Sequence, residues 1–331
     1  MRIVQFLHGN ALGGMEKFCL DLSNALSEEH EVMLLADPVF KHYCRENIVF
    51  IPLDIEKSRN NLGLLFSIYS QIKVFQADII HAHKQNSIQI LKRISPFLKV
   101  PYVATKHDTQ KKKAFYGLKY VISISDETTK TINAENIYKI NNGIPYIKPK
   151  KIILPDTFNI ISVGGLRKVK GFDILIESMA KITFDFHLTI IGEGNERQNL
   201  ERLIKTLDLE KKVSLLGFKD NVQDYLYSAD LQVISSYSEG FSLAMVEGVF
   251  YSPVLVSTEV SGSKDILSDT LLYKQKNIVE KLNEVSQKYT IYKQVFHDIK
   301  IAYQKTLTID HCMHEHLKVY NTMIDYESKK V

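Results

Sequence analysis

Two glutamates stand eight positions apart around a turn whose residue types could bind a phosphate. Glu239 precedes Gly240 and Ser242, and Glu247 follows in an apolar run that predicts a helix. The turn comes directly after a β-rich run, so its backbone N–H groups would face the carboxyl edge of a parallel sheet, where helix N-termini bind anions. The carboxylates would flank the anion and accept hydrogen bonds from sugar hydroxyls. Two solvated glutamates beside an ordinary helix start are the structural alternative.

A basic turn lies at the end of an earlier predicted strand. It contains Arg167, Lys168 and Lys170. The turn starts at Gly165 and leads into a predicted helix at Gly171, where a lysine side chain can reach a phosphate. Exposed residues of a merely basic loop are the alternative here.

Two pairs of glycines also follow predicted strands. Gly13 and Gly14 come after the first strand, and Gly192 and Gly194 after a later one. Such glycines let the backbone approach a ligand closely. Neither turn has the third glycine of a dinucleotide fingerprint, which argues against a nicotinamide dehydrogenase, and a tight turn without a ligand explains both equally well.

Histidines gather at three places along the chain. His81 and His83 alternate at one strand end, His107 follows another strand, and residues 311–316 contain three histidines with Cys312. We predict no metal site at any of them, because the strand pair lacks a third ligand and the pattern at 311–316 is equally typical of a helix. The chain also has no Asp-x-Asp pair of the kind that holds a catalytic manganese ion. Buried structural histidines are the alternative interpretation.

The elements that would position these residues alternate between strands and helices. In the first half, strands are expected at 2–7, 31–36, 48–52, 78–81, 101–105 and 120–124, with helices at 15–26, 62–75 and 85–97. Prolines and lysines interrupt the pattern at 143–157, and strands then resume at 158–163, 187–191, 213–216 and 231–235, with helices at 171–180 and 196–207. This rhythm predicts two Rossmann-like α/β domains, residues 1–145 and 146–331, and a helical segment at 278–326 that could pack back on the first domain.

Composition restricts the class of protein further. The chain has 331 residues, 45% hydrophobic and 24% charged, which suits two globular domains rather than a disordered or fibrous chain. Three cysteines far apart predict a reducing compartment, and neither a signal peptide nor an apolar run long enough to cross a bilayer is evident. The formal charge is uneven, at +6 for residues 1–150 and −2 for the remainder. Lysines 106, 111, 112, 113 and 119 supply much of that excess, as a solvated loop or as a surface for anionic lipid or phosphate.

The segment from Glu239 to Glu247 resembles the Glu-x7-Glu signature of the family 4 retaining glycosyltransferases, and further motifs of that family occur in order along most of the chain. The resemblance implies the GT-B fold, in which two Rossmann-like domains face each other across a cleft, with the acceptor bound by the first domain and a nucleotide sugar by the second. It implies that Glu239 contacts the donor sugar, Glu247 the ribose, and Lys170 the pyrophosphate. His107, in a Thr-x-His motif, would reach the donor sugar.

The resemblance also implies further donor-binding residues, and the sequence departs from the family pattern at two positions. Gly165 stands where the family has an arginine, for which Arg167 or Lys168 would have to compensate, and Ser252 stands where a glycine usually precedes Pro253. The expected catalytic residues are His107, Lys170 and Glu239, and the expected donor-binding residues are Gly13, Gly14, Gly165, Arg167, Gly192, Phe218, Gly240, Phe241, Ser242, Leu243 and Glu247.

The function implied is a hexosyltransferase-like, metal-independent retaining glycosyltransferase of cell-surface polysaccharide or lipopolysaccharide synthesis. It would need no cofactor, would use a nucleotide diphosphate sugar, with a UDP-sugar as the expected donor, and would act on a glycan or a lipid-linked acceptor. We expect a cytoplasmic protein with peripheral contact to an anionic inner membrane face and no nucleic-acid partner. Two alternatives remain open: a nucleotide-sugar-binding module without turnover, which Gly165 favours, and a sugar epimerase of the same fold.

Overall fold

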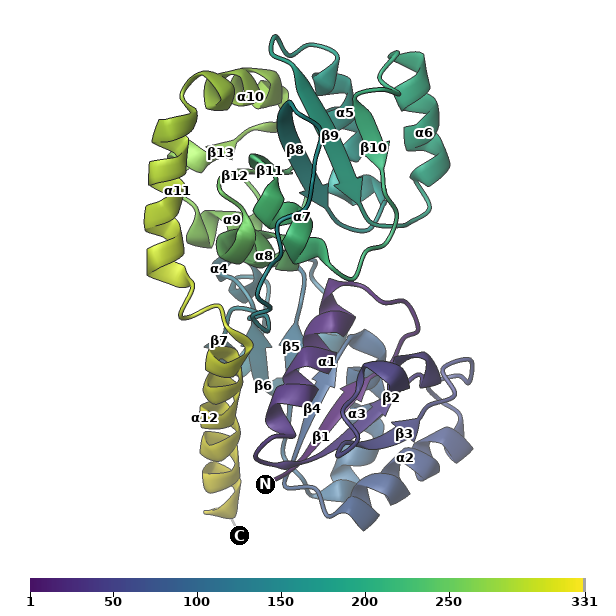
Figure 1. The fold of residues 1–331 in the computed structure, drawn as a ribbon. Coiled ribbons are helices and arrows are strands. Elements are labelled where there is room, and N and C mark those ends of the chain that lie inside the picture. Colours follow the sequence, from purple (N-terminus) through teal and green to yellow (C-terminus); the bar gives the residue numbers. More distant parts are fainter. Residues whose placement is uncertain (330–331) are drawn as a thin grey trace. The chain divides into compact units, whose positions relative to one another are not determined.

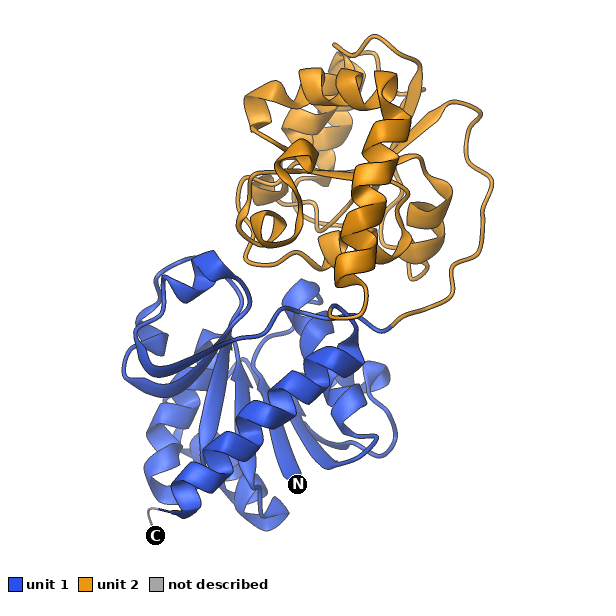
Figure 2. Cartoon of the chain, turned by 90° about the vertical axis from the view of Figure 1, so that its left-hand side faces the viewer, with its two compact units in different colours: residues 1–145, 307–331 blue, residues 146–306 orange. Residues whose placement is uncertain are grey.

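The computed structural model describes residues 1–329, which form two compact units (Figure 2). Unit 1 contains Met1–Pro145 and the C-terminal segment from Leu307, and unit 2 contains Tyr146–Thr306. Each unit has one sheet, of seven and six strands respectively, in which all neighbouring strands are parallel. The predicted α/β class is therefore confirmed.

Unit 1 is built around the strand order β3-β2-β1-β4-β5-β6-β7 (Figure 1). The strands β1, β2 and β4 are buried along almost their whole length, as expected of a parallel sheet covered on both faces. The elements are β1 (Arg2–Leu7), α1 (Gly14–Leu26), β2 (Glu31–Ala36), β3 (Val49–Pro52), α2 (Leu62–Phe75), β4 (Ile79–His83), α3 (Gln85–Leu98), β5 (Tyr102–Lys106), β6 (Leu118–Ser123), α4 (Asp126–Thr129), β7 (Ala134–Lys139) and α12 (Ile309–Ser328).

Alternate residues of these strands serve two different faces of the sheet. On one face, apolar residues such as Val4, Ile80 and Ala104 pack with helices α2 and α3 in a single core cluster. On the other face, Gln5 and His81 meet α12 through hydrogen bonds to its Tyr320. The second face is therefore unusually polar for the centre of a parallel sheet.

Unit 2 has the strand order β10-β9-β8-β11-β12-β13. Its elements are β8 (Phe158–Val163), α5 (Phe172–Met179), β9 (Phe186–Ile191), α6 (Arg197–Thr206), β10 (Val213–Leu215), α7 (Val222–Ser228), β11 (Leu231–Ile234), α8 (Leu243–Tyr251), β12 (Leu255–Thr258), α9 (Ser261–Ile266), β13 (Leu272–Tyr273), α10 (Ile278–Gln287) and α11 (Tyr289–Tyr303). In both units the first strand lies between later strands, which places a switch of strand order beside β1 and beside β8.

The helical segment predicted at 278–326 consists of helices α10, α11 and α12, and α12 belongs to unit 1. Helix α11 ends at Tyr303, and α12 begins after Thr308, whose side chain accepts a hydrogen bond from the backbone N–H of His311. Helix α12 packs against α1 and buries Tyr320 and Met323 completely (Figures 1 and 2). The second unit therefore ends at Thr306 rather than at residue 331.

Three strands lie outside the expected set. Strand β7 is an edge strand with alternating half-buried and exposed residues, and its charged residues hide it from an apolar count. Strand β13 has only two residues, too few to show a period, and the four residues of β12 include two polar ones. Among the described residues, no helix is both long and apolar enough to cross a membrane.

Candidate functional site

The loops that follow β8 and β11 form the candidate site of unit 2. These strands are neighbours in the sheet, and their carboxyl ends lie at the switch of strand order, where open α/β sheets bind ligands. Lys170 ends the first loop and Glu239 lies in the second. Their side chains form an ion pair, with Lys170 Nζ 2.5 Å from Glu239 Oε1, and only 14% and 12% of the two side chains is exposed. The structure thus joins two of the three expected catalytic residues.

Further bonds order the second loop and join it to the first. Ser236 Oγ donates to Glu239 Oε1 at 2.7 Å, and Ser235 Oγ donates to the backbone oxygen of Lys170 at 3.0 Å. Gly171, with a φ of 64°, allows the closest approach, because a Cβ at this position would lie 2.2 Å from the carbonyl oxygen of Ser235. Gly171 is thus required for both its conformation and its lack of a side chain. The glutamate is oriented before any ligand arrives.

Helix α8 starts directly after the second loop. Ser242 occupies the N-cap position but makes no side-chain capping bond, so its hydroxyl does not satisfy the first-turn amides as expected of a cap. Gly240, Phe241 and Leu243 are buried around this helix start, while Glu247 is half-buried one turn further along. The second loop thus carries the carboxylate that pairs with Lys170 and leads into a helix N-terminus, a feature suited to an anion.

The side chain of Arg167 lies beside Gly165, the position at which the resemblance implies an arginine. Arg167 is exposed, and its Nε would lie 3.6 Å from a Cβ built on Gly165. Lys168 instead forms an ion pair with Asp173. Of the two residues expected to compensate, only Arg167 has its charged group beside the glycine.

The glycines after β9 serve mainly to pack loops against each other. Gly192 has a φ of 144°, and a Cβ there would lie 2.0 Å from the carbonyl oxygen of Gly164. Its N–H donates to the carbonyl oxygen of Gly217 at 2.9 Å. Phe218 follows with 58% of its surface exposed, so its ring is accessible for stacking on a planar group.

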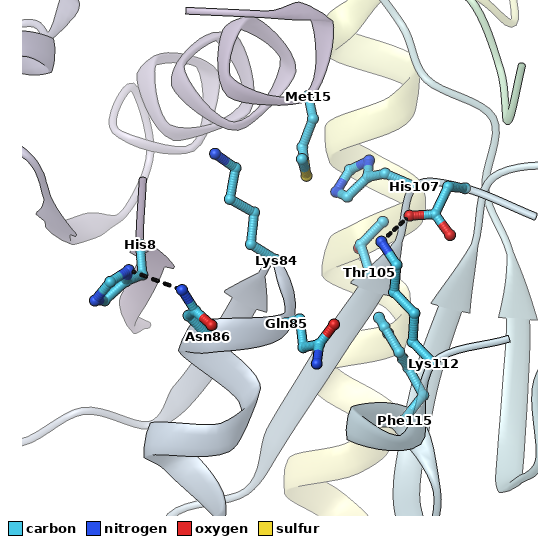
Figure 3. A pocket seen from close by; sticks show the side chains of 10 residues that line it. His8, Met15, Lys84, Gln85, Asn86, Thr105, His107, Lys112 and Phe115 are labelled. Atoms are coloured by element: carbon cyan, nitrogen blue, oxygen red, sulfur yellow. Dashed lines mark hydrogen bonds and ion pairs between the residues drawn. The ribbon is translucent and has the colours of Figure 1, made fainter. Parts of the chain in front are cut away.

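A pocket of about 280 Å³ forms the candidate site of unit 1, at the carboxyl ends of β1, β4 and β5 (Figure 3). It is rich in nitrogen-bearing side chains. His8 is 7% exposed, and its Nε2 is buried without a hydrogen-bond partner. The pocket is lined by His8, Met15, Lys84, Gln85, Asn86, Thr105, His107, Asp108, Lys112 and Phe115.

The first glycine turn is tied to this pocket through an acidic residue. The N–H of Gly13, the residue before α1, donates to Glu16 Oε2 at 3.0 Å, and the buried Glu16 carboxylate pairs with Lys84. The Gly13 amide is therefore already hydrogen-bonded within the turn, whereas Gly14 is the first residue of the helix and is exposed. Lys84 has a φ of 71°, an uncommon conformation for a residue with a side chain.

Burial keeps His81, His83, His107 and His316 of unit 1 neutral. Loss of hydration lowers the pKa of His107 to about 3 and that of His316 to about 4, and holds the pKa values of His81 and His83 well below their usual range. Both nitrogens of His81 and of His83 are in hydrogen bonds to other side chains. No three metal-ligating side chains within residues 1–329 are placed to hold a metal ion.

The basic strip expected between residues 106 and 119 is not a continuous cationic surface. Lys106 is fully buried, and its ammonium donates to the backbone oxygen of Gln110 at 2.7 Å. Lys112 pairs with Asp108, and Lys119 pairs with Glu327. Only lysines 111 and 113 of the five are exposed, because folding uses the others to order the loop and to fix α12.

Other departures and omissions have structural explanations. Ser252 is buried, and its Oγ donates to Gln232 Oε1 at 2.7 Å, so the hydroxyl belongs to the core of unit 2. Lys84 was not among the predicted site residues, although it directly follows His83. Gln5 and Tyr320 had no local signal, since only the sheet register and the return of α12 bring them to the histidines.

Residues 12–144 match the family described as Glycosyltransferase Family 4, and residues 145–294 match the Glycosyl transferases group 1. Among solved structures, Anabaena Alr3699/HepE in complex with UDP and glucose aligns with a TM-score of 0.81 over 97% of this chain and 100% of its own, at 16% identity. That likeness shows the fold, and the predicted GT-B class is confirmed.

Two curated relatives match shorter segments. The N-acetylgalactosamine-N,N'-diacetylbacillosaminyl-diphospho-undecaprenol 4-alpha-N-acetylgalactosaminyltransferase of Campylobacter jejuni is 40% identical over 119 residues, 36% of this chain and 32% of that protein. The lipopolysaccharide core biosynthesis glycosyltransferase LpsE of Rhizobium meliloti is 30% identical over 110 residues, 33% of this chain and 32% of that protein. The matched segments thus span about a third of the length of each relative.

Acid is expected to destabilise unit 1. The imidazoles of His81, His83, His107 and His316 stay neutral in the folded protein but gain a proton in the unfolded chain below pH 6.5, so each removes up to about 1.4 kcal/mol of unfolding free energy per pH unit as the pH falls toward 4. Urea unfolding at pH 7.5, 6 and 5 measures this slope. His316→Gln should flatten it, and His311→Gln, an exposed position on the same helix, should not. Equal slopes in all three proteins would contradict the assignment.

Proposed function

This chain belongs to the group 1 glycosyltransferases of family 4, and from that premise we propose that it transfers a sugar, with retention of anomeric configuration, from a nucleotide diphosphate sugar to an acceptor hydroxyl. The carrying observation is the Lys170–Glu239 pair at the strand-order switch of unit 2. This pair places an ammonium group that could bind a diphosphate beside a carboxylate that could accept hydrogen bonds from sugar hydroxyls. This arrangement favours a nucleotide sugar as the ligand over a nucleotide alone or a sugar alone.

The proposed reaction breaks the bond between the anomeric carbon and the phosphate oxygen, and the nucleotide diphosphate leaves with the electron pair. The acceptor oxygen bonds to the same carbon, and its proton passes to a leaving phosphate oxygen. Most new charge develops on that phosphate, so the Lys170 ammonium and the N-terminus of α8 supply the main stabilisation without a metal ion. Glu239 then orients the sugar through its hydroxyls.

The remaining donor contacts follow the same logic. Arg167 supplies the second cation for the pyrophosphate, since its guanidinium lies beside Gly165. Glu247 binds the ribose, the exposed Phe218 lies beside the base, and the backbone around Gly192, Gly240 and Leu243 completes the site. A UDP-sugar is the proposed donor, which the UDP and glucose in HepE support.

Unit 1 would bind the acceptor, and its His107 would contact the donor sugar. Its pocket is lined by Lys84, Asn86 and Lys112 as well as histidines, a set suited to hydroxyls and anionic groups. The names of the Campylobacter and Rhizobium relatives support a lipid-linked or lipopolysaccharide glycan as the acceptor. Activity in the cytoplasm with peripheral contact to an anionic membrane stays a prediction, for which lysines 111 and 113 are the exposed cations.

A binding module without turnover is the second candidate, because Gly165 removes one cation from the expected place. Nucleotide release from UDP-, GDP- and ADP-sugars in the presence of EDTA separates the two. We expect release from one donor by the native protein and a loss of at least about tenfold in Glu247→Ala, which removes the ribose contact. Binding of a donor without any release would favour the module. A release that EDTA abolishes would contradict the metal-independent reaction.

Arg167 and Lys168 form a matched pair for testing the second cation. Arg167→Ala should lower kcat/KM for the donor by about 10- to 100-fold, the effect of losing one charged contact to a phosphate. Lys168→Ala should change it less than about twofold, because that ammonium pairs with Asp173. Equal effects of the two substitutions, measured as nucleotide release at subsaturating donor, would argue against the role of Arg167.

A further inference from the structure

Six side chains on the α12 face of unit 1 form one continuous chain of hydrogen bonds. Both ends of the chain, His107 and Thr105, line the pocket (Figure 3), while the middle lies inside the core. In order, the members are His107, His83, Gln5, Tyr320, His81 and Thr105.

Four of the five distances are those of ordinary hydrogen bonds, and the one between Gln5 and Tyr320 is longer. His107 Nε2 lies 3.2 Å from His83 Nδ1, and His83 Nε2 lies 2.8 Å from Gln5 Oε1. Gln5 Nε2 lies 3.4 Å from Tyr320 Oη. The hydroxyl of Tyr320 is 2.7 Å from His81 Nδ1, and His81 Nε2 is 2.6 Å from Thr105 Oγ1. The other five members of the chain are at least 95% buried, and His107 is partly buried.

The amide of Gln5 gives this chain a direction. Its oxygen only accepts, so His83 carries its proton on Nε2, and Nδ1 of His83 accepts from Nε2–H of His107. Its nitrogen only donates, so Tyr320 accepts from Gln5 and donates to Nδ1 of His81. His81 then donates from Nε2 to Thr105. Rotating the Gln5 amide by half a turn would reverse every one of these bonds consistently, so the amide orientation selects between two polarities.

The selected polarity determines what the two ends offer. His107 is neutral with its proton on Nε2, and its Nδ1 is left as a buried acceptor without a hydrogen-bond partner. Thr105 accepts from His81, which leaves its own O–H to donate. A buried unsatisfied acceptor costs free energy, so a ligand that supplies a donor to it gains the corresponding stabilisation.

We propose that Gln5 and Tyr320 are positioning residues that hold His107 in the Nε2–H tautomer, so that its Nδ1 accepts a hydrogen bond from a sugar hydroxyl. This inference rests on the proposed function for the identity of that hydroxyl. Neither residue lines the pocket, and Tyr320 reaches the chain from a helix more than 200 positions later in the sequence. The returning α12 thereby acts on the pocket chemistry as well as on the stability of unit 1.

Nitrogen chemical shifts of histidine in uniformly ¹⁵N-labelled protein at pH 7 test this directly, because they distinguish the two neutral tautomers. In the native protein, His107, His83 and His81 should each be Nε2–H. Tyr320→Phe keeps the ring but frees the Gln5 amide to rotate, so His107 should become a mixture of tautomers. Tyr292→Phe, which removes a hydroxyl from another fully buried tyrosine in unit 2, should leave all three unchanged. A native Nδ1–H tautomer at His107, or an unchanged tautomer in Tyr320→Phe, would overturn the proposal.

Gln5→Glu tests the direction of the chain in a second way. A carboxylate accepts on both oxygens, so His107 and His83 should stay Nε2–H while Tyr320 turns its proton toward residue 5 and His81 becomes Nδ1–H. An unchanged His81 would overturn the role of Gln5. This readout needs no donor cleavage, so its failure is distinct from failure of the proposed transferase reaction. Where nucleotide release is found, Tyr320→Phe should lower kcat/KM about fivefold, the loss of roughly one net hydrogen bond.

Discussion

The switch of strand order beside the first strand of each parallel sheet is the constraint on which both candidate sites depend. Loops at the carboxyl ends of neighbouring strands diverge there, and they leave room for side chains and helix N-termini to face a ligand. In unit 2 the loops after β8 and β11 meet at this point and bring Lys170 to Glu239. In unit 1 the ends of β1, β4 and β5 meet at the same kind of point and surround the pocket.

Charge is arranged differently at the two places. Unit 2 keeps a nearly buried ion pair, Lys170 with Glu239, whose cation a diphosphate could share. The Ser236 hydroxyl also donates to Glu239, so neither charge is buried alone before a ligand binds. Unit 1 keeps His81 and His83 neutral through burial, and hydrogen bonds to uncharged side chains satisfy both nitrogens of each ring. The first arrangement suits stabilisation of a leaving anion, and the second suits recognition of uncharged hydroxyls.

Local sequence patterns predicted the parts of this structure that local chemistry decides. Apolar runs located most strands, and the glycine-bounded turns located the loops that hold Lys170 and Glu239. Positions that depend on long-range packing were not accessible in this way. The neutralisation of Lys112 and Lys119, the burial of Lys106 and the meeting of Tyr320 with His81 all require the tertiary fold. The short strand β13 and the charged edge strand β7 were missed because neither carries enough apolar residues to form a period.

We propose that Lys170, held by Glu239 at the switch of unit 2, binds the diphosphate of a nucleotide sugar. Calorimetric titration with UDP, GDP and ADP and with the matching monophosphates tests it most directly. For the preferred base, the native protein should bind the diphosphate at least about tenfold more tightly than the monophosphate, since the additional phosphate gains a charged hydrogen bond. Lys170→Ala should lose most of this difference. Equal affinities for the two nucleotides in the native protein, or the same discrimination in the variant, would contradict the account.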